Sequence, residues 1–91
     1  MRVVVEYYGP AREAAGTGRE ELILAEPTTA MALIERHAQQ QGGRLAALLL
    51  HEGKLSKSLL IAVDDVQATA DNPLPLREGA IIAVIPPVSG G

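Results

Sequence analysis

The sequence contains no cysteine, phenylalanine or tryptophan, and its aromatic residues are Tyr7 and Tyr8 alone. Without cysteine, the chain has no disulfide and no thiolate of its own for metal binding or nucleophilic attack. The net charge is −3 and the eight basic residues are scattered, so neither a basic stripe nor an aromatic platform is present to bind nucleic acid. Because Phe and Trp are absent, the hydrophobic core must be aliphatic, built from Leu, Ile, Val and Ala.

Long apolar runs are missing as well. No stretch approaches the ~18 consecutive apolar residues that indicate a membrane-spanning helix. The first six residues, Met1 to Glu6, have the pattern of a strand and are too short and too acidic for a signal peptide. With 91 residues, of which 47% are hydrophobic, the chain has enough apolar material for one core. We expect one cytoplasmic domain spanning residues 1–91.

Sequence motifs for a self-contained active site are also missing. Gly16-Thr17-Gly18 lacks the later glycine and the Lys-Ser/Thr pair of a phosphate-binding loop. None of the serines has a neighbouring histidine and acid that would activate it, and no histidine pair has the spacing of a metal site. We predict that the chain binds no cofactor and no metal itself.

Turn residues and hydrophobic periodicity divide the chain into short elements. The predicted elements are strand 2–8, helix 11–15 ending at Gly16, strand 20–25, a main helix from the cap Thr28 to Gln41, helix 44–51 closed by Gly53, a solvated connection 54–57, strand 58–63, strand 66–69 and strand 80–85. The first two strands are expected to pair antiparallel. The last, apolar on both faces, should lie buried on both sides in the middle of the sheet, beside the first. A mixed sheet packed against one main helix is the α+β, ubiquitin-like β-grasp arrangement.

Three polar features within these elements could be functional or structural. His37 lies on the predicted core stripe of the main helix, and we interpret it as a half-packed boundary residue because no second ligand stands at a helical or loop spacing. Asp64-Asp65 is interpreted as a turn, since consecutive turn residues point apart and Asp favours turns. His51 is predicted at a helix end, without a chemical role. The other residues of the core stripe are Ala30, Leu33, Ile34 and Gln41.

The last six residues are the most unusual part of the chain. Pro86 and Pro87 lack the N–H groups needed to continue a strand ladder and favour a stiff, extended exit. Val88-Ser89 follows, and Gly90-Gly91 then ends the chain with no Cβ and a free carboxylate. Such a flexible Gly-Gly end on a stiff root could enter a narrow channel of a partner protein, although an inert, frayed terminus has the same composition. We predict that residues 86–91 form an extended reactive tail.

A terminal carboxylate is an anion at neutral pH and a poor electrophile, so it must be activated before it can react. The usual route is an acyl-adenylate made with ATP. Because this chain has no nucleotide-binding motif, another protein would have to use the ATP. The activated acyl group could then accept a sulfur donor, which gives a thiocarboxylate, or a lysine amine, which gives a conjugate.

Three segments carry a resemblance to a known family. The tail, Pro86 to Gly91, resembles that of MoaD, the small sulfur-carrier subunit of molybdopterin synthase. Residues 8–16, with the pair Arg12-Glu13 followed by Gly16, are similar to the first strand–helix segment of that family, and residues 72–79 are similar to the loop before its last strand. The likeness covers the whole chain.

This resemblance implies a β-grasp sulfur carrier. A MoeB-like, ATP-dependent enzyme would adenylate Gly91, and a sulfur-donating protein would convert it to a thiocarboxylate. The tail would then enter a MoaE-like large subunit of molybdopterin synthase, where sulfur passes to cyclic pyranopterin monophosphate to form molybdopterin. We place the docking face near Arg12 and the tail.

The chain departs from the MoaD pattern at Ala80 and Ile81, which stand where the family commonly has acidic residues. Tyr7 and Tyr8 replace phenylalanine, and Asp64 stands near a common asparagine. Two alternatives therefore stay open. One is a related sulfur carrier or ubiquitin-like modifier that serves thiamine, cysteine or tRNA thiolation. The other is a non-catalytic β-grasp interaction module.

Overall fold

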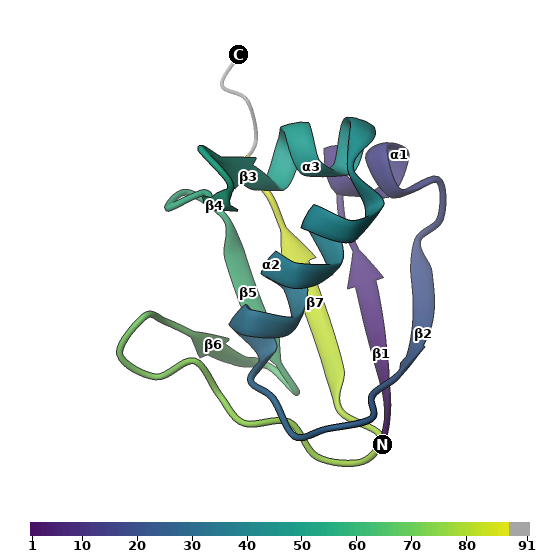
Figure 1. The fold of residues 1–91 in the computed structure, drawn as a ribbon, viewed down its shortest axis with the longest axis vertical. Coiled ribbons are helices and arrows are strands. Elements are labelled where there is room, and N and C mark those ends of the chain that lie inside the picture. Colours follow the sequence, from purple (N-terminus) through teal and green to yellow (C-terminus); the bar gives the residue numbers. More distant parts are fainter. Residues whose placement is uncertain (88–91) are drawn as a thin grey trace.

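The computed structural model describes residues 1–87, which form a five-stranded sheet, three helices and a small two-stranded hairpin (Figure 1). In chain order the elements are β1 (Arg2–Tyr7), α1 (Pro10–Ala15), β2 (Arg19–Ile23), α2 (Ala30–Gln41), α3 (Gly43–Leu49), β3 (Leu50–His51), β4 (Lys54–Leu55), β5 (Leu60–Val63), β6 (Val66–Ala68) and β7 (Ile81–Ile85). None of the helices in this part of the chain is long and apolar enough to cross a bilayer.

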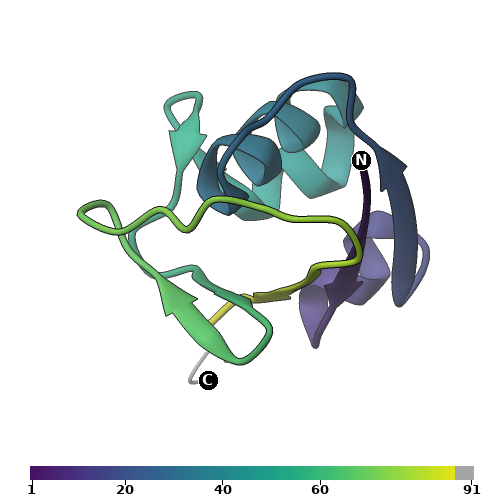
Figure 2. The same cartoon turned by 90° about the horizontal axis from the view of Figure 1, so that it is seen from below.

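The strand order of the sheet is β2-β1-β7-β5-β6. Strands β1 and β2 pair antiparallel, and β7 lies in the middle, parallel to β1 and antiparallel to β5. The predicted hairpin of the first two strands and the central position of the last strand are therefore confirmed. Together with α2 and α3 on one side of the sheet (Figure 2), this order confirms the predicted β-grasp architecture.

The core lies between the sheet and helices α2 and α3. Val3 and Val5 of β1 and Ile82 and Val84 of β7 are completely buried and belong to the core cluster, in which they pack against the apolar sides of these helices. The largest side chains that are fully buried there are Ile34, Leu49, Ile82, Val3, Val5 and Val84. These residues are all aliphatic, as expected for a chain without Phe or Trp.

Only one face of β7 is buried, so the prediction that the last strand is covered on both sides is wrong. Ile82 and Val84 are completely buried, whereas Ile81 and Ile85 on the other face are 38% and 37% exposed. The physical reason is the layer arrangement. The helices cover one face of the sheet, and no other element of residues 1–87 lies over the opposite face (Figure 2). We call this opposite side the open face.

The core stripe of α2 was predicted correctly except at its C-terminal end. Ala30, Leu33, Ile34 and His37 are buried, but Gln41 is exposed and Ala38 is buried instead. Position 38 stands four residues after Ile34 and so lies on the same side of the helix. Gln41 is the last residue of α2, just before the chain turns away at Gly42.

The segment after α2 differs from its prediction. Helix α3 ends at Leu49, and His51 belongs to β3, where it pairs with Lys54 of β4. The turn between them has positive φ at Glu52 (54°) and Gly53 (81°), as a tight hairpin requires. His51 is thus an exposed hairpin residue and not a helix end. Of residues 54–57, which were predicted to be a connection, Lys54 and Leu55 form strand β4.

The N-terminus of α2 is capped by Thr29 and not by Thr28 as predicted. The Ala32 N–H donates to Thr29 Oγ1 at 3.2 Å, which satisfies one of the unpaired donors of the first turn. The loop before β7 adds a second anchor, because the Ala30 N–H donates to the Leu74 carbonyl at 2.9 Å.

We expect Thr29→Ala to lower the free energy of unfolding by about 1 kcal/mol, the usual cost of removing a capping hydroxyl. Chemical denaturation measures this loss. Thr28→Ala is the matched control, because no side-chain hydrogen bond of Thr28 is found among residues 1–87, and it should cost clearly less. Equal losses in the two variants would contradict the assignment of Thr29 as the cap.

Candidate functional site

The root of the tail is held in the centre of the sheet. Strand β7 has a partner on each side, and its last residue, Ile85, pairs with Leu60 of β5. The ladder ends there, as the two prolines predicted, and Pro86 is buried while Pro87 is exposed. The strand therefore delivers the chain from a rigid position, at the end of the sheet where α1, α3 and the β3–β4 hairpin lie (Figure 1).

Val88, Ser89, Gly90 and Gly91 lie outside the described residues. The roles predicted for them, including the thiocarboxylate at Gly91, stay predictions.

The open face of the sheet exposes several large apolar side chains to solvent. Side chains of β1, β5 and β7 that point away from the helices line it, and the chain continues from it directly into Pro86. Its exposed large apolar residues on these strands and just after β1 are Tyr8 (46%), Leu60 (36%), Ile81 (38%) and Ile85 (37%). Contiguous apolar surface of this kind marks interaction sites more often than ordinary surface does. The open face is therefore the candidate docking face.

Arg12, which we placed near the docking face from the sequence, lies exposed on α1. Its guanidinium packs over Gly18, where an added Cβ would lie 2.7 Å from Arg12 Nε. This contact ties α1 to the start of β2. The assignment of Arg12 to a docking surface stays a prediction, while the apolar open face is the stronger candidate.

Sequence reasoning missed a buried polar cluster, which joins β1, β2 and α2. The Tyr7 hydroxyl donates to Glu20 Oε2 at 2.9 Å, and His37 Nε2 lies 3.2 Å from the same oxygen. Burial raises the pKa of Tyr7, and the hydrogen bond and charge of Glu20 raise it further. His37 is more deeply buried than the predicted half-packed residue, and its partner is a carboxylate 17 positions away. The cluster satisfies buried polar groups and fastens the helix to the sheet.

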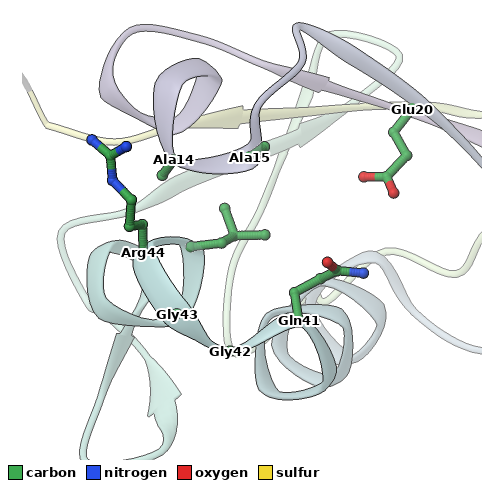
Figure 3. A pocket seen from close by; sticks show the side chains of 8 residues that line it. Ala14, Ala15, Glu20, Gln41, Gly42, Gly43 and Arg44 are labelled. Atoms are coloured by element: carbon green, nitrogen blue, oxygen red, sulfur yellow. The ribbon is translucent and has the colours of Figure 1, made fainter.

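A small cavity of about 230 Å³ lies between α1 and the junction of α2 and α3. Figure 3 shows Ala14 and Ala15 on one side of it and Gly42, Gly43 and Arg44 on the other, with Glu20 and Gln41 at one end. The Glu20 carboxylate binds Tyr7 and His37 through Oε2, and the residues that line the cavity include no hydroxyl, amine or imidazole that could serve as a nucleophile.

Asp64 and Asp65 form the turn between β5 and β6, as predicted. Both have positive φ, 47° and 71°, and Asp64 Oδ1 accepts the Ile81 N–H at 3.1 Å. Within residues 1–87 no group of three or more His, Asp or Glu side chains is arranged to hold a metal ion.

The fold and the site together define a class: a small ubiquitin-like, β-grasp protein that presents an apolar sheet face and whose central strand leads into the C-terminal tail. Comparison with known proteins agrees. The model of the ThiS family matches residues 5–91, so the match includes the tail. The chain belongs to the ThiS family, and the resemblance to MoaD is confirmed.

Three relatives illustrate the range of similar proteins. The molybdopterin synthase sulfur carrier subunit of Escherichia coli (strain K12) is 34% identical over 89 residues, which cover 98% of this chain and 99% of that protein. The structure of subunits 1 and 2 of the molybdopterin-converting factor from Helicobacter pylori superposes with a TM-score of 0.63 at 24% identity and full coverage of both chains. Small archaeal modifier protein 1 from Methanosarcina acetivorans superposes with a TM-score of 0.77 at 22% identity, covering 99% of this chain and 96% of that chain.

Proposed function

We propose that this protein is the sulfur carrier subunit of a molybdopterin synthase. The observation that carries the proposal is the 34% identity to the Escherichia coli carrier over nearly the full length of both chains. A family match that extends through residue 91, a tail root held in the middle of the sheet and an apolar open face all support it.

The chemistry begins with activation of the terminal carboxylate. An oxygen of the Gly91 carboxylate attacks the α-phosphorus of ATP on a separate adenylating enzyme, and pyrophosphate leaves. Sulfide-level sulfur, delivered as HS⁻ by a donor protein, then attacks the acyl carbon, AMP leaves with the oxygen it had gained, and loss of the S–H proton gives the thiocarboxylate. The chain supplies the acyl group, while partner proteins supply the catalytic groups.

The proposed final acceptor is cyclic pyranopterin monophosphate, bound to a large subunit that receives the tail. The Helicobacter pylori structure is a complex of subunit 1 with subunit 2, which supports a partner of this kind. We propose that the large subunit covers the open face, because burial of Ile85 and Tyr8 would remove exposed apolar surface near the tail root, and burial of Ile81 would do the same at the start of β7.

Intact-mass measurement tests the carrier function. After incubation with the adenylating enzyme, ATP and a sulfur donor, a fraction of the protein should be heavier by the difference between a sulfur and an oxygen atom. Omitting ATP is the control and should give the unmodified mass. Unmodified protein in the complete reaction would contradict a sulfur carrier. A mass increase through attachment to a lysine of another protein would instead favour a ubiquitin-like modifier.

A further inference from the structure

The open face contains a hollow that is acidic at its rim and apolar at its floor. It has a volume of about 250 Å³ and is lined by Glu6, Tyr8, Ala62, Asp64, Asp65, Ile81 and Ala83. The hollow exists because Ala62 of β5 and Ala83 of β7 are paired across the sheet, which places two short side chains side by side. Larger side chains stand around them, with Tyr8 and Ile81 among them.

The rim carries more negative charge than is neutralised nearby. Glu6 lies beside the floor, since it pairs with Ala83, and the β5–β6 turn supplies Asp64 and Asp65. Arg19 Nη1 is 3.3 Å from Glu6 Oε2 and compensates one of these three charges, which leaves a net charge of −2. The carboxylate of Asp65 makes no hydrogen bond or ion pair with any residue between 1 and 87.

The negative charge of the rim affects the ionisation of Tyr8. Its hydroxyl donates to Glu6 Oε1 at 3.1 Å, and this hydrogen bond and the charge of Glu6 raise the pKa of Tyr8, with smaller contributions from desolvation and from Asp65. A raised pKa means that a second negative charge is unfavourable at this place. The charges of Glu6 and Asp65, which contribute to this shift, favour a positive charge at the same place.

The size and the lining of the hollow point to one kind of ligand. A volume of about 250 Å³ suits a single side chain better than a drug-sized molecule. No group of three or more acidic or histidine side chains among residues 1–87 is arranged to hold a metal ion. A guanidinium combines a weakly hydrated planar face, which suits the alanine floor and the Tyr8 ring, with edge donors for carboxylates. Lysine offers a compact, strongly hydrated charge without such a face.

We infer that the hollow between Glu6, Tyr8 and the Asp64-Asp65 turn receives an arginine side chain of the partner protein that covers the open face. The inference rests on the proposed function, which makes the large subunit of the synthase that partner. The arginine would pair with the carboxylate of Asp65, which would otherwise be an unpaired charge inside an apolar interface. The contact would also fix the orientation of the carrier when its tail enters the partner.

The decisive variant is Asp65→Lys, which reverses the charge at the rim without removing a hydrogen bond within residues 1–87. We expect the Kd for the large subunit from the same organism to rise about tenfold or more. Asp71→Lys makes the same charge change on an exposed loop outside the hollow, and its Kd should change less than about twofold. The difference between the variants should shrink in 1 M salt, where the Debye length falls to about 3 Å. Equal weakening by both variants would overturn the inference.

A second measurement uses the isolated protein. N-acetyl-arginine amide should shift the backbone amide signals of Ala62 and Ala83 in NMR spectra, whereas the uncharged citrulline analogue should not. Asp65→Lys should abolish these shifts and Asp71→Lys should keep them. Equal shifts with both compounds would count against a charge-selective hollow.

The outcomes separate this inference from the proposed function. If the thiocarboxylate forms and the wild-type protein binds the large subunit, but Asp65→Lys binds as Asp71→Lys does, the arginine contact is wrong and the carrier function stands. If the thiocarboxylate forms but no complex with the large subunit is found, the docking of the open face on that subunit is overturned. If no thiocarboxylate forms at all, the carrier function itself is contradicted.

Discussion

A chain that carries one additional residue after Gly91 is expected to form no thiocarboxylate. The reason is chemical: in the extended chain the Gly91 carbonyl belongs to a peptide bond, so it has no carboxylate oxygen to attack ATP. Release of pyrophosphate by the adenylating enzyme should fall to the level of a reaction without carrier, and the intact mass should stay unchanged. This is the largest effect on activity that we expect from a change of this size.

Two controls distinguish the loss of the carboxylate from a loss of folding. The same addition before Met1 should leave activity intact, because the N-terminus lies at the end of the sheet opposite the end of β7 (Figure 1). There the amino group of Met1 makes a 3.1 Å hydrogen bond to the Leu24 carbonyl, which an amide N–H can replace. Proteolytic removal of the C-terminal addition, leaving Gly91 as the last residue, should restore adenylation. Pyrophosphate release at the parent rate by the extended protein would rule out Gly91 as the reacting group.

The sequence predicts most elements of this fold because their signals are local. Alternation in residues 2–8 predicts β1, Pro10 marks the first turn of α1, and Gly16 takes the left-handed conformation that ends it, with φ of 78°. The double proline correctly predicts where β7 ends. Each signal needs only a few neighbouring residues, so no knowledge of the tertiary structure is required.

What the sequence does not predict depends on residues that are distant along the chain. Glu20 and His37 meet only when α2 packs against β2, and the hollow of the open face forms only when Ala62 and Ala83 become cross-strand partners. The early end of the helix predicted to reach His51 is a different case, because Leu50 and His51 pair with Leu55 and Lys54 in a local hairpin that the Leu-rich pattern hides.

The two faces of β7 show the same limit most clearly. Its residues are apolar on both sides, and such a pattern is typical of a strand that helices cover on both faces. In this protein the helices cover only the face of Ile82 and Val84. A surface kept apolar for a partner protein has the same composition as one that the chain itself buries, so the residues alone do not reveal which of the two faces is the core.

Substitutions of the two neighbouring isoleucines should separate these roles. Ile82 is completely buried, so Ile82→Ala should lower the free energy of unfolding by about 2–5 kcal/mol through lost burial and the cavity left behind. That is a large share of the roughly 5–15 kcal/mol expected in total. In a domain of this length it should lower Tm by more than about 10 °C.

Ile81→Ala removes the same atoms from the opposite side of the same strand. Because Ile81 is 38% exposed, the loss of stability should be about 1 kcal/mol or less. Its binding to the large subunit should nevertheless weaken severalfold, since the side chain lies on the open face beside the acidic hollow. Thermal unfolding and a binding titration of both variants measure the two effects. A stability loss for Ile81→Ala as large as that for Ile82→Ala would mean that the open face is covered within this chain. Unchanged binding of Ile81→Ala would mean that the partner docks elsewhere, because an apolar face that a partner buries must contribute to the affinity.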